Sequence, residues 1–128
     1  MHFHLANTAH TPEVQINLTQ SLLLLRGVCF PENASEFFEP ITEFLKEHLS
    51  ELSGRELQLH LELTYLNSAG KKGLFQLVKF LLDHAHSLRV VLYQGTEDEE
   101  LEDYEGLVQF WQREPRIRVE QRDGYYQT

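Results

Sequence analysis

Residues 57–70 have the sequence LQLHLELTYLNSAG, and this stretch decides the fold. Leucine occupies every second position from Leu57 to Leu63, which is the spacing of a β-strand with one buried face. The strand leads into Asn67-Ser68-Ala69-Gly70, after which apolar residues recur at helical spacing. The pattern therefore predicts a strand that passes directly into a helix reaching about His84. The apolar stripe of that helix is Leu74, Leu77, Val78, Leu81 and Leu82.

Further strands are predicted on both sides of this unit, because short alternating or apolar segments recur along the chain. The segment Leu88-Arg89-Val90-Val91-Leu92-Tyr93 after the helix is the next predicted strand, so strand, helix and strand predict a right-handed parallel crossover. Ahead of the unit, an alternating strand and a leucine-rich strand are joined by a short turn. This arrangement predicts an antiparallel hairpin whose second strand lies deeper inside. The strands are predicted at residues 13–18, 22–26, 57–63, 88–93 and 116–122, and the polar residues 3–12 predict a short edge strand or an arm.

Two further helices are predicted from their start signals. In Pro31-Glu32-Asn33-Ala34-Ser35-Glu36, the asparagine is placed as N-cap and the last glutamate completes a capping box. This helix is predicted to reach about Leu52, with Pro40 marking a kink or the end of a first short turn. A short third helix is predicted at residues 107–111. The predicted fold is an α/β sandwich with a mixed sheet of four to five strands and two or three helices.

Composition limits the classes of protein that fit. The 128 residues match one domain, so residues 1–128 are predicted to form a single unit. The net charge of −9 argues against binding nucleic acid or an anionic membrane through bulk charge. A single cysteine, Cys29, excludes an internal disulfide framework and a multi-cysteine zinc site, and a buried thiol is predicted there. With no membrane-length apolar run and no signal-peptide pattern, the expectation is a cytoplasmic protein without membrane insertion.

The junction between the central strand and its helix is the candidate functional site. A helix N-terminus there presents free amides and the positive end of the helix dipole. Ser68 fits this position either as a helix cap or as a phosphorylation site. A phosphate would add roughly −1.5 to −2 charge and three acceptor oxygens. Asn67, Ala69 and Gly70 are predicted to shape the turn, and Lys71 is predicted to be the nearer phosphate neighbour, although Lys71 and Lys72 also fit plain surface positions.

Three features together resemble one protein family. Pro31-Glu32-Asn33 opens a helix with aromatic residues soon after, a leucine-rich alternating strand follows, and Tyr65-Leu66-Asn67-Ser68 ends that strand. These motifs resemble the SiaC family of bacterial regulatory phosphoproteins, and the order of strands and helices agrees from about Glu13 to Val119. The resemblance implies a fold similar to STAS domains, including the anti-sigma-factor antagonists. Those proteins carry a phosphorylatable serine at the same kind of junction, followed by a small residue and glycine.

The resemblance also implies a partner switch. Such a protein is phosphorylated by a dedicated Ser/Thr protein kinase and dephosphorylated by a PP2C-type phosphatase. In its unmodified form it binds a diguanylate cyclase and promotes synthesis of cyclic di-GMP, which favours biofilm formation. Ser68 falls on the acceptor position, where the family has threonine, and Ala69-Gly70 replaces a pair that is often hydroxylic. The expected partner interface is the surface around Ser68, including Pro31, Glu32, Asn33 and Tyr65.

Several alternatives stay open at this stage. One is a STAS-type anti-sigma-factor antagonist, and Thr64 is an alternative phosphate acceptor. Another is a small serine hydrolase using Ser68, which the missing Gly-x-Ser-x-Gly elbow disfavours, so no enzymatic activity is expected. The seven histidines show no familiar ligand spacing, and neither a metal nor a cofactor is expected. The acidic run at residues 97–105 fits either a solvated loop and helix start or a face that docks a basic surface.

Overall fold

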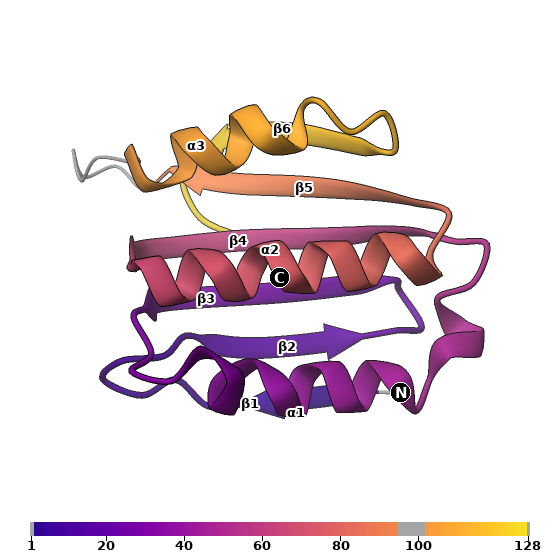
Figure 1. The fold of residues 1–128 in the computed structure, drawn as a ribbon, viewed down its shortest axis with the longest axis horizontal. Helices are drawn as coiled ribbons and strands as arrows, with labels where there is room; N and C mark the ends of the chain where they lie inside the picture. Colours follow the sequence, from indigo (N-terminus) through magenta and orange to yellow (C-terminus); the bar gives the residue numbers. More distant parts are fainter. Residues whose placement is uncertain (1, 95–101, 128) are drawn as a thin grey trace.

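The computed structural model describes residues 2–94 and 102–127, and a mixed β-sheet lies at its centre (Figure 1). Within these residues the sheet has six strands in the order β1-β2-β3-β4-β5-β6. The first two pairings are antiparallel, and the pairings β3–β4, β4–β5 and β5–β6 are parallel. The strands are β1 (His2–Leu5), β2 (Glu13–Asn17), β3 (Leu22–Cys29), β4 (Glu56–Leu66), β5 (Ser87–Gln94) and β6 (Ile117–Asp123).

The predicted α/β sandwich, hairpin and parallel crossover are confirmed, with more strands than the predicted four to five. The additional strand is β1, which lies at the edge of the sheet and pairs with β2 in the register His2↔Asn17. Residues 2–5 therefore form the edge strand that was one of two options for this polar segment. Each parallel pair is connected through a helix, as parallel strands require a crossover.

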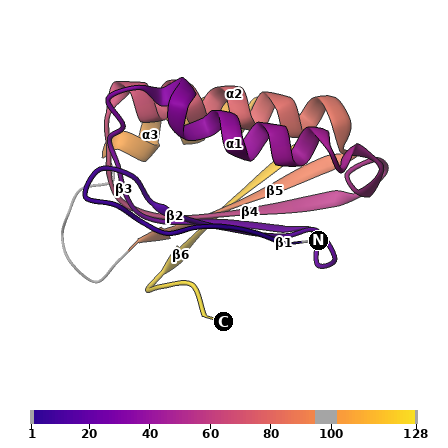
Figure 2. The same ribbon diagram turned by 90° about the horizontal axis from the view of Figure 1, so that it is seen from below.

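Within residues 2–94 and 102–127, the three α-helices cover the same face of the sheet, and no helix lies on the opposite face (Figure 2). They are α1 (Ala34–Lys46), α2 (Ser68–His84) and α3 (Glu102–Trp111), and a 3-10 turn, η1 (Leu49–Glu51), follows α1. The end of α2 at His84 is confirmed. Of the acidic run, residues 97–101 lie outside the described part of the chain.

The first helix is shorter than predicted and passes through its proline. It ends at Lys46 rather than near Leu52, because the chain tightens into η1, and Leu52 is nevertheless fully buried. Pro40 lies inside α1, so the prediction that it ends a first short turn is wrong. Both Pro40 and Glu36 are exposed, so the proline lies on the solvent side of the helix, where the lost backbone hydrogen bond is least costly.

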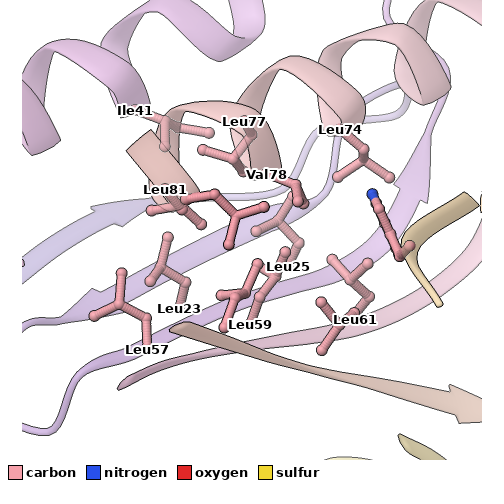
Figure 3. Close-up of a cluster of buried hydrophobic side chains, with 14 of the residues drawn as sticks. Leu23, Leu25, Ile41, Leu57, Leu59, Leu61, Leu74, Leu77, Val78 and Leu81 are labelled. Atoms are coloured by element: carbon pink, nitrogen blue, oxygen red, sulfur yellow. The ribbon is translucent and has the colours of Figure 1, made fainter. Parts of the chain in front are cut away.

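The core lies between the helices and the alternating leucines of the central strands (Figure 3). Leu57, Leu59 and Leu61 of β4 are fully buried, as the period of two requires. Burying one such side chain contributes about 1.5–3 kcal/mol. Gly73 lets α2 approach α1 closely, since a Cβ there would lie 2.1 Å from the Phe38 ring. Cys29 is buried, which raises the pKa of its thiol to about 12, and the predicted buried cysteine is confirmed.

Candidate functional site at the start of helix α2

Ser68 is the first residue of α2 and is exposed, immediately after the end of β4. The helix cap is the preceding residue, Asn67, whose Oδ1 accepts a hydrogen bond from the Gly70 amide at 2.7 Å. The alternative in which Ser68 itself caps the helix is therefore wrong. Asn67 takes that role because its backbone is still extended, with φ −92° and ψ 178°, whereas Ser68 already belongs to the helix. Among the described residues, none forms a hydrogen bond with the Ser68 hydroxyl, so this oxygen faces solvent without a structural task.

Asn67 also connects the Tyr65-Leu66-Asn67-Ser68 motif to the Pro31-Glu32-Asn33 motif. Its Nδ2 donates to the Pro31 carbonyl at 3.4 Å, and its backbone amide donates to the Cys29 carbonyl at 3.1 Å. The end of β3 and the end of β4 therefore meet beside one another. Both α1 and α2 begin at this same end of the strands, where β3 and β4 finish (Figure 1).

The predicted partner-binding residues differ in their exposure to solvent. Pro31 is buried and positions Asn67 through its carbonyl, whereas Glu32 and Asn33 are exposed. Asn33 is confirmed as the cap of α1, because its side chain accepts from the Glu36 amide at 3.2 Å. Tyr65 is 52% exposed at the end of β4, three residues before Ser68.

Tyr65 belongs to a row of three rings that the sequence did not reveal. Its ring meets Phe30 edge to face at 5.3 Å between centroids, and Phe30 meets His10 in the same manner at 4.9 Å. The Phe30 amide also donates to the His10 carbonyl at 2.8 Å. Phe30 could have been found from the sequence, because it directly precedes the Pro31 motif. His10 lies in a polar segment that carries no such motif. Exposed aromatic rings of this kind are frequent anchors in protein interfaces.

Gly70 sets how closely α2 approaches the end of β3. A Cβ at this position would lie 2.9 Å from the Cys29 carbonyl oxygen and 2.9 Å from Cδ1 of Leu66. The predicted role of Gly70 in shaping the turn thus has a steric cause. The glycine holds the first turn of the helix, and with it Ser68, against the ends of both strands.

The electrostatic setting of Ser68 favours an anion. The amides of Ser68 and Ala69 have no carbonyl partner inside the helix, since they belong to its first turn. Lys71 is half-buried and Lys72 is exposed in the same turn. A dianion on the Ser68 oxygen would therefore meet free amides, the helix dipole and nearby lysines, an interaction of about 0.3–1 kcal/mol with the dipole alone.

Catalytic and metal chemistry find little support in the described residues. The Ser68 hydroxyl has no histidine or carboxylate within hydrogen-bonding distance in the part of the chain described, whereas a serine nucleophile needs such a base. Across residues 2–94 and 102–127, no three His, Cys, Asp or Glu side chains gather in a geometry that could hold a metal ion. None of the described helices has the length and apolar composition required to cross a membrane.

The sequence matches one family of regulatory proteins along most of its length. The sequence model of the SiaC family regulatory phosphoproteins matches residues 5–114, and the chain belongs to this family. The resemblance seen in the motifs around Pro31 and Ser68 is thereby confirmed. A curated relative, an uncharacterized protein of Pseudomonas aeruginosa (strain UCBPP-PA14), is 31% identical over 83 residues. That alignment covers 65% of this chain and 64% of the relative's length.

Solved structures of SiaC from Pseudomonas aeruginosa share the fold. The crystal structure of apo-SiaC superimposes with a TM-score of 0.74 at 19% identity, covering 95% of this chain and 98% of that one. A chain from the crystal structure of the diguanylate cyclase SiaD in complex with its activator SiaC matches with a TM-score of 0.65. The identity is again 19%, with 94% of this chain and 99% of that one covered.

Proposed function

We propose that this chain is a phosphorylation-controlled partner-switch protein whose unphosphorylated form binds and activates a diguanylate cyclase. Its membership of a family of regulatory phosphoproteins supports the switch, and the complex of SiaD with its activator SiaC supports this class of partner. The observation that carries the proposal is the exposed Ser68, which serves neither cap nor core and follows the exposed Tyr65 by three residues.

The physical basis of the switch is an unequal effect of phosphate on the fold and on the interface. The free amides at the start of α2 tolerate the new charge, so the folded chain keeps its structure. A partner seated over Ser68, Tyr65 and the Glu32-Asn33 turn would meet a dianion that it must desolvate or avoid. Unpaired charge in an interface costs several kcal/mol, which is sufficient to release the partner.

The proposal assigns roles to the residues around Ser68. Asn67, Ala69 and Gly70 hold the turn, and Lys71 is the nearest candidate to neutralise the phosphate. Pro31 holds the turn in place through its carbonyl, and Glu32, Asn33 and Tyr65 provide the contact surface. Residues 1–128 act as one cytoplasmic domain without catalytic activity, and a Ser/Thr protein kinase and a PP2C-type phosphatase set the state of Ser68.

A second candidate, an anti-sigma-factor antagonist of the STAS type, is favoured by one observation. Ser68 is followed by Ala69 and Gly70, as in that class, rather than by hydroxylic residues. Co-purification distinguishes the two functions. A captured diguanylate cyclase supports the first, whereas a captured kinase that also binds a sigma factor supports the second.

The test compares cyclase binding by the unchanged chain with binding by Ser68→Ala, Ser68→Asp and Tyr65→Ala. We expect Ser68→Ala to bind like the unchanged chain and Ser68→Asp to bind at least tenfold more weakly. Tyr65→Ala should also lose at least tenfold, because an exposed aromatic anchor is removed without disturbing the core. Ser53→Asp is the matched control, since Ser53 is exposed in the loop at the start of β4, far along the strand from Ser68. Equal loss in Ser68→Ala and Ser68→Asp would contradict the switch.

A further inference from the structure

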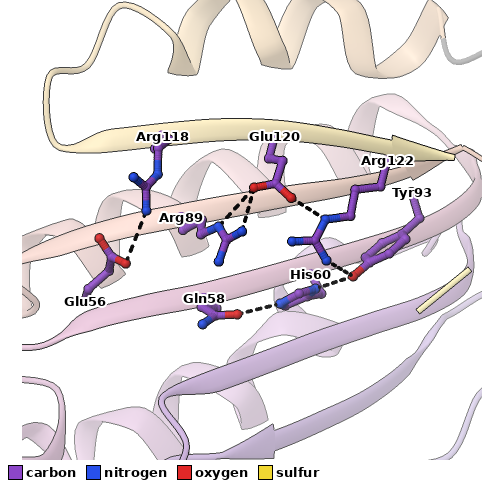
Figure 4. A network of polar contacts seen from close by, with 8 residues as sticks. All are labelled: Glu56, Gln58, His60, Arg89, Tyr93, Arg118, Glu120 and Arg122. Atoms are coloured by element: carbon purple, nitrogen blue, oxygen red, sulfur yellow. Dashed lines mark hydrogen bonds and ion pairs between the residues drawn. The ribbon is translucent and has the colours of Figure 1, made fainter. Parts of the chain in front are cut away.

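Charged side chains on the open face of the sheet pair with one another across the strands. Arg118 pairs with Glu56 at 3.6 Å, and Arg89 pairs with Glu120 at 2.6 Å (Figure 4). Glu120 also pairs with Arg122, two residues further along β6. These charges are therefore already neutralised within the sheet.

The residues after β6 lie against the same open face. They turn back beneath the sheet, on the side opposite the helices (Figure 2). The Tyr126 ring meets the His60 ring edge to face at 5.1 Å, and the Tyr126 carbonyl accepts from Nη2 of Arg26 at 3.1 Å. The open face thus has contacts from its own chain. The helical side of the molecule differs in this respect.

An apolar groove of about 500 Å³ lies between α2 and α3. Phe75, Val78 and Leu82 line it from α2, and Phe110 and Trp111 line it from α3. Phe110 is 59% exposed, which is the largest exposure of any bulky hydrophobic side chain in the described part of the chain. Exposed apolar surface beside a groove is typical of a place where another chain binds.

A polar ridge on α2 borders this groove. It consists of Lys72, Gln76, Lys79 and Asp83, which are all exposed, and the last three also line the groove. Within residues 2–94 and 102–127, neither lysine and not the aspartate forms an ion pair. The ridge charges therefore differ from those of the open sheet face, because a second chain could still neutralise them.

The ridge is complementary to itself. Its residues are separated by four, three and four positions, so their spacing is the same in both directions of the helix. Two antiparallel copies of α2 related by a two-fold axis can therefore align all four positions. In this alignment, Lys72 of each copy lies opposite Asp83 of the other, and Gln76 of each lies opposite Lys79 of the other. The amide oxygen of glutamine can accept from the lysine ammonium, and no like charges of the ridge face each other.

The same alignment places the Phe110 ring over the groove of the other copy. The Phe110 ring meets Phe75 at 5.0 Å between centroids, so it lies near Gln76 along α2. The groove extends along α2 from Phe75 to Asp83, so its middle lies near Lys79. Since the two-fold axis runs across the helices, the α3 side of each copy faces the α3 side of the other. An axis that opposes Gln76 and Lys79 therefore brings each ring over the middle of the opposite groove.

We propose that this chain forms a two-fold symmetric dimer through the groove between α2 and α3, with the ridge from Lys72 to Asp83 and the Phe110 ring as its contacts. Burial of the two rings drives association. The ridge charges fix the orientation of the copies more than they add affinity, because exposed ion pairs contribute little. The dimer requires neither a phosphate on Ser68 nor a cyclase, so it goes beyond the proposed switch.

The first test is sedimentation equilibrium of the full chain over a concentration series. We expect the mass of two chains at high concentration and a dissociation constant at least tenfold higher for Phe110→Ser. Leu49→Ser is the matched control, since Leu49 is another exposed hydrophobic residue, 36% exposed after the end of α1. It should leave the dissociation constant unchanged. Circular dichroism establishes that each variant is folded, and Phe110→Gln replaces Phe110→Ser if the serine variant is not.

The second test exchanges the two charges at the ends of the ridge. Asp83→Lys opposes two lysines in each half of the dimer, and Lys72→Asp opposes two aspartates, so each should raise the dissociation constant about tenfold. The double variant restores opposite charges and should return the dissociation constant to within about threefold of the unchanged chain. High salt should reduce the effect of each single change, because these charges are exposed. Lys46→Asp, on the exposed end of α1, is the control and should have no effect.

Three results would overturn the proposal. The first is a monomer of the unchanged chain at every concentration up to about 100 μM, where even a weak dimer would be populated. If Phe110→Ser then also weakened cyclase binding, the groove would belong to that partner. The second is an equally stable dimer in folded Phe110→Ser. The third is a double charge exchange that does not restore the dimer, which would contradict the antiparallel alignment of the two α2 helices.

Discussion

Lowering the pH from 7 to 4 is expected to destabilise this protein through His60. Burial, with smaller contributions from Arg122 and Arg89, lowers the pKa of His60 to about 4 from an ordinary value of 6.5, and Glu120 opposes this weakly. The neutral ring is fixed by its two hydrogen bonds, because Nδ1 must accept from the Tyr93 hydroxyl while Nε2 donates to Gln58. Protonation would remove the acceptor and place a cation beside two arginines.

The sign and size follow from these values. Between pH 6.5 and 4 the unfolded chain binds a proton at this histidine that the folded chain does not, so stability falls as the pH falls. The contribution is complete above pH 6.5, and about 3 kcal/mol of it is lost by pH 4. The pKa values of the Glu13 and Glu120 carboxyls are also lowered, and their contributions to stability are lost as the pH falls below the ordinary value of 4.5, so they overlap with that of His60 only at the acid end. A variant is therefore needed to isolate the histidine.

The assay is urea unfolding at pH 7, 6, 5 and 4 for the unchanged chain and for His60→Gln. Glutamine retains a donor and an acceptor but does not titrate, so its lower packing affects all pH values alike. The unchanged chain should lose about 3 kcal/mol more than His60→Gln between pH 7 and 4. Parallel pH profiles for the two proteins would refute the burial of a neutral His60 under the residues that follow β6.

Three further predictions concern the start of helix α2 and its surroundings. Gly70→Ala should lower the free energy of unfolding by about 1–3 kcal/mol, because the new Cβ would collide with the Cys29 carbonyl. The control, Gly106→Ala, lies in open space on α3 and should raise the free energy of unfolding by about 0.5–1 kcal/mol. Equal effects of the two substitutions in chemical denaturation would contradict the close approach at Gly70. Asn67→Ala should cost about 0.5–2 kcal/mol by removing the helix cap, and hydrogen exchange should show faster opening of the Gly70 amide, whereas Ser68→Ala should leave that amide unchanged. Cys29, with its raised pKa and full burial, should resist iodoacetamide at pH 8 in the folded chain and react in urea, so rapid labelling of the folded chain would show that the end of β3 is open.

The central unit was predictable because its signals are local. The leucines of β4 repeat with period two and those of α2 with the period of a helix, so both elements and their junction follow from neighbouring residues. Strand β1 was left between two options because its four residues are polar on one side and gain their structure only by pairing with β2. The end of α1 was misplaced because Leu52 keeps the apolar spacing even though the chain has passed into a 3-10 turn.

The local structure around Ser68 was predictable in part. The exposure of Ser68 follows from its place at a strand-to-helix junction, whereas the choice between Asn67 and Ser68 as cap depends on the residue at which the backbone becomes helical. Phe30 and His10 join Tyr65 only once β3 and β4 are aligned. Arg26 and Tyr126 are 100 residues apart in the sequence, and no local pattern predicts a contact over such a separation.

The most direct test of the proposed switch measures cyclase affinity before and after phosphorylation of the purified chain. The chain is phosphorylated with its kinase until fragment mass spectrometry places one phosphate on Ser68, and binding to the diguanylate cyclase is measured by calorimetry. Treatment with a PP2C-type phosphatase then tests reversal. The account predicts at least a tenfold loss of affinity on phosphorylation and full recovery afterwards. An unchanged affinity with Ser68 fully phosphorylated would contradict it.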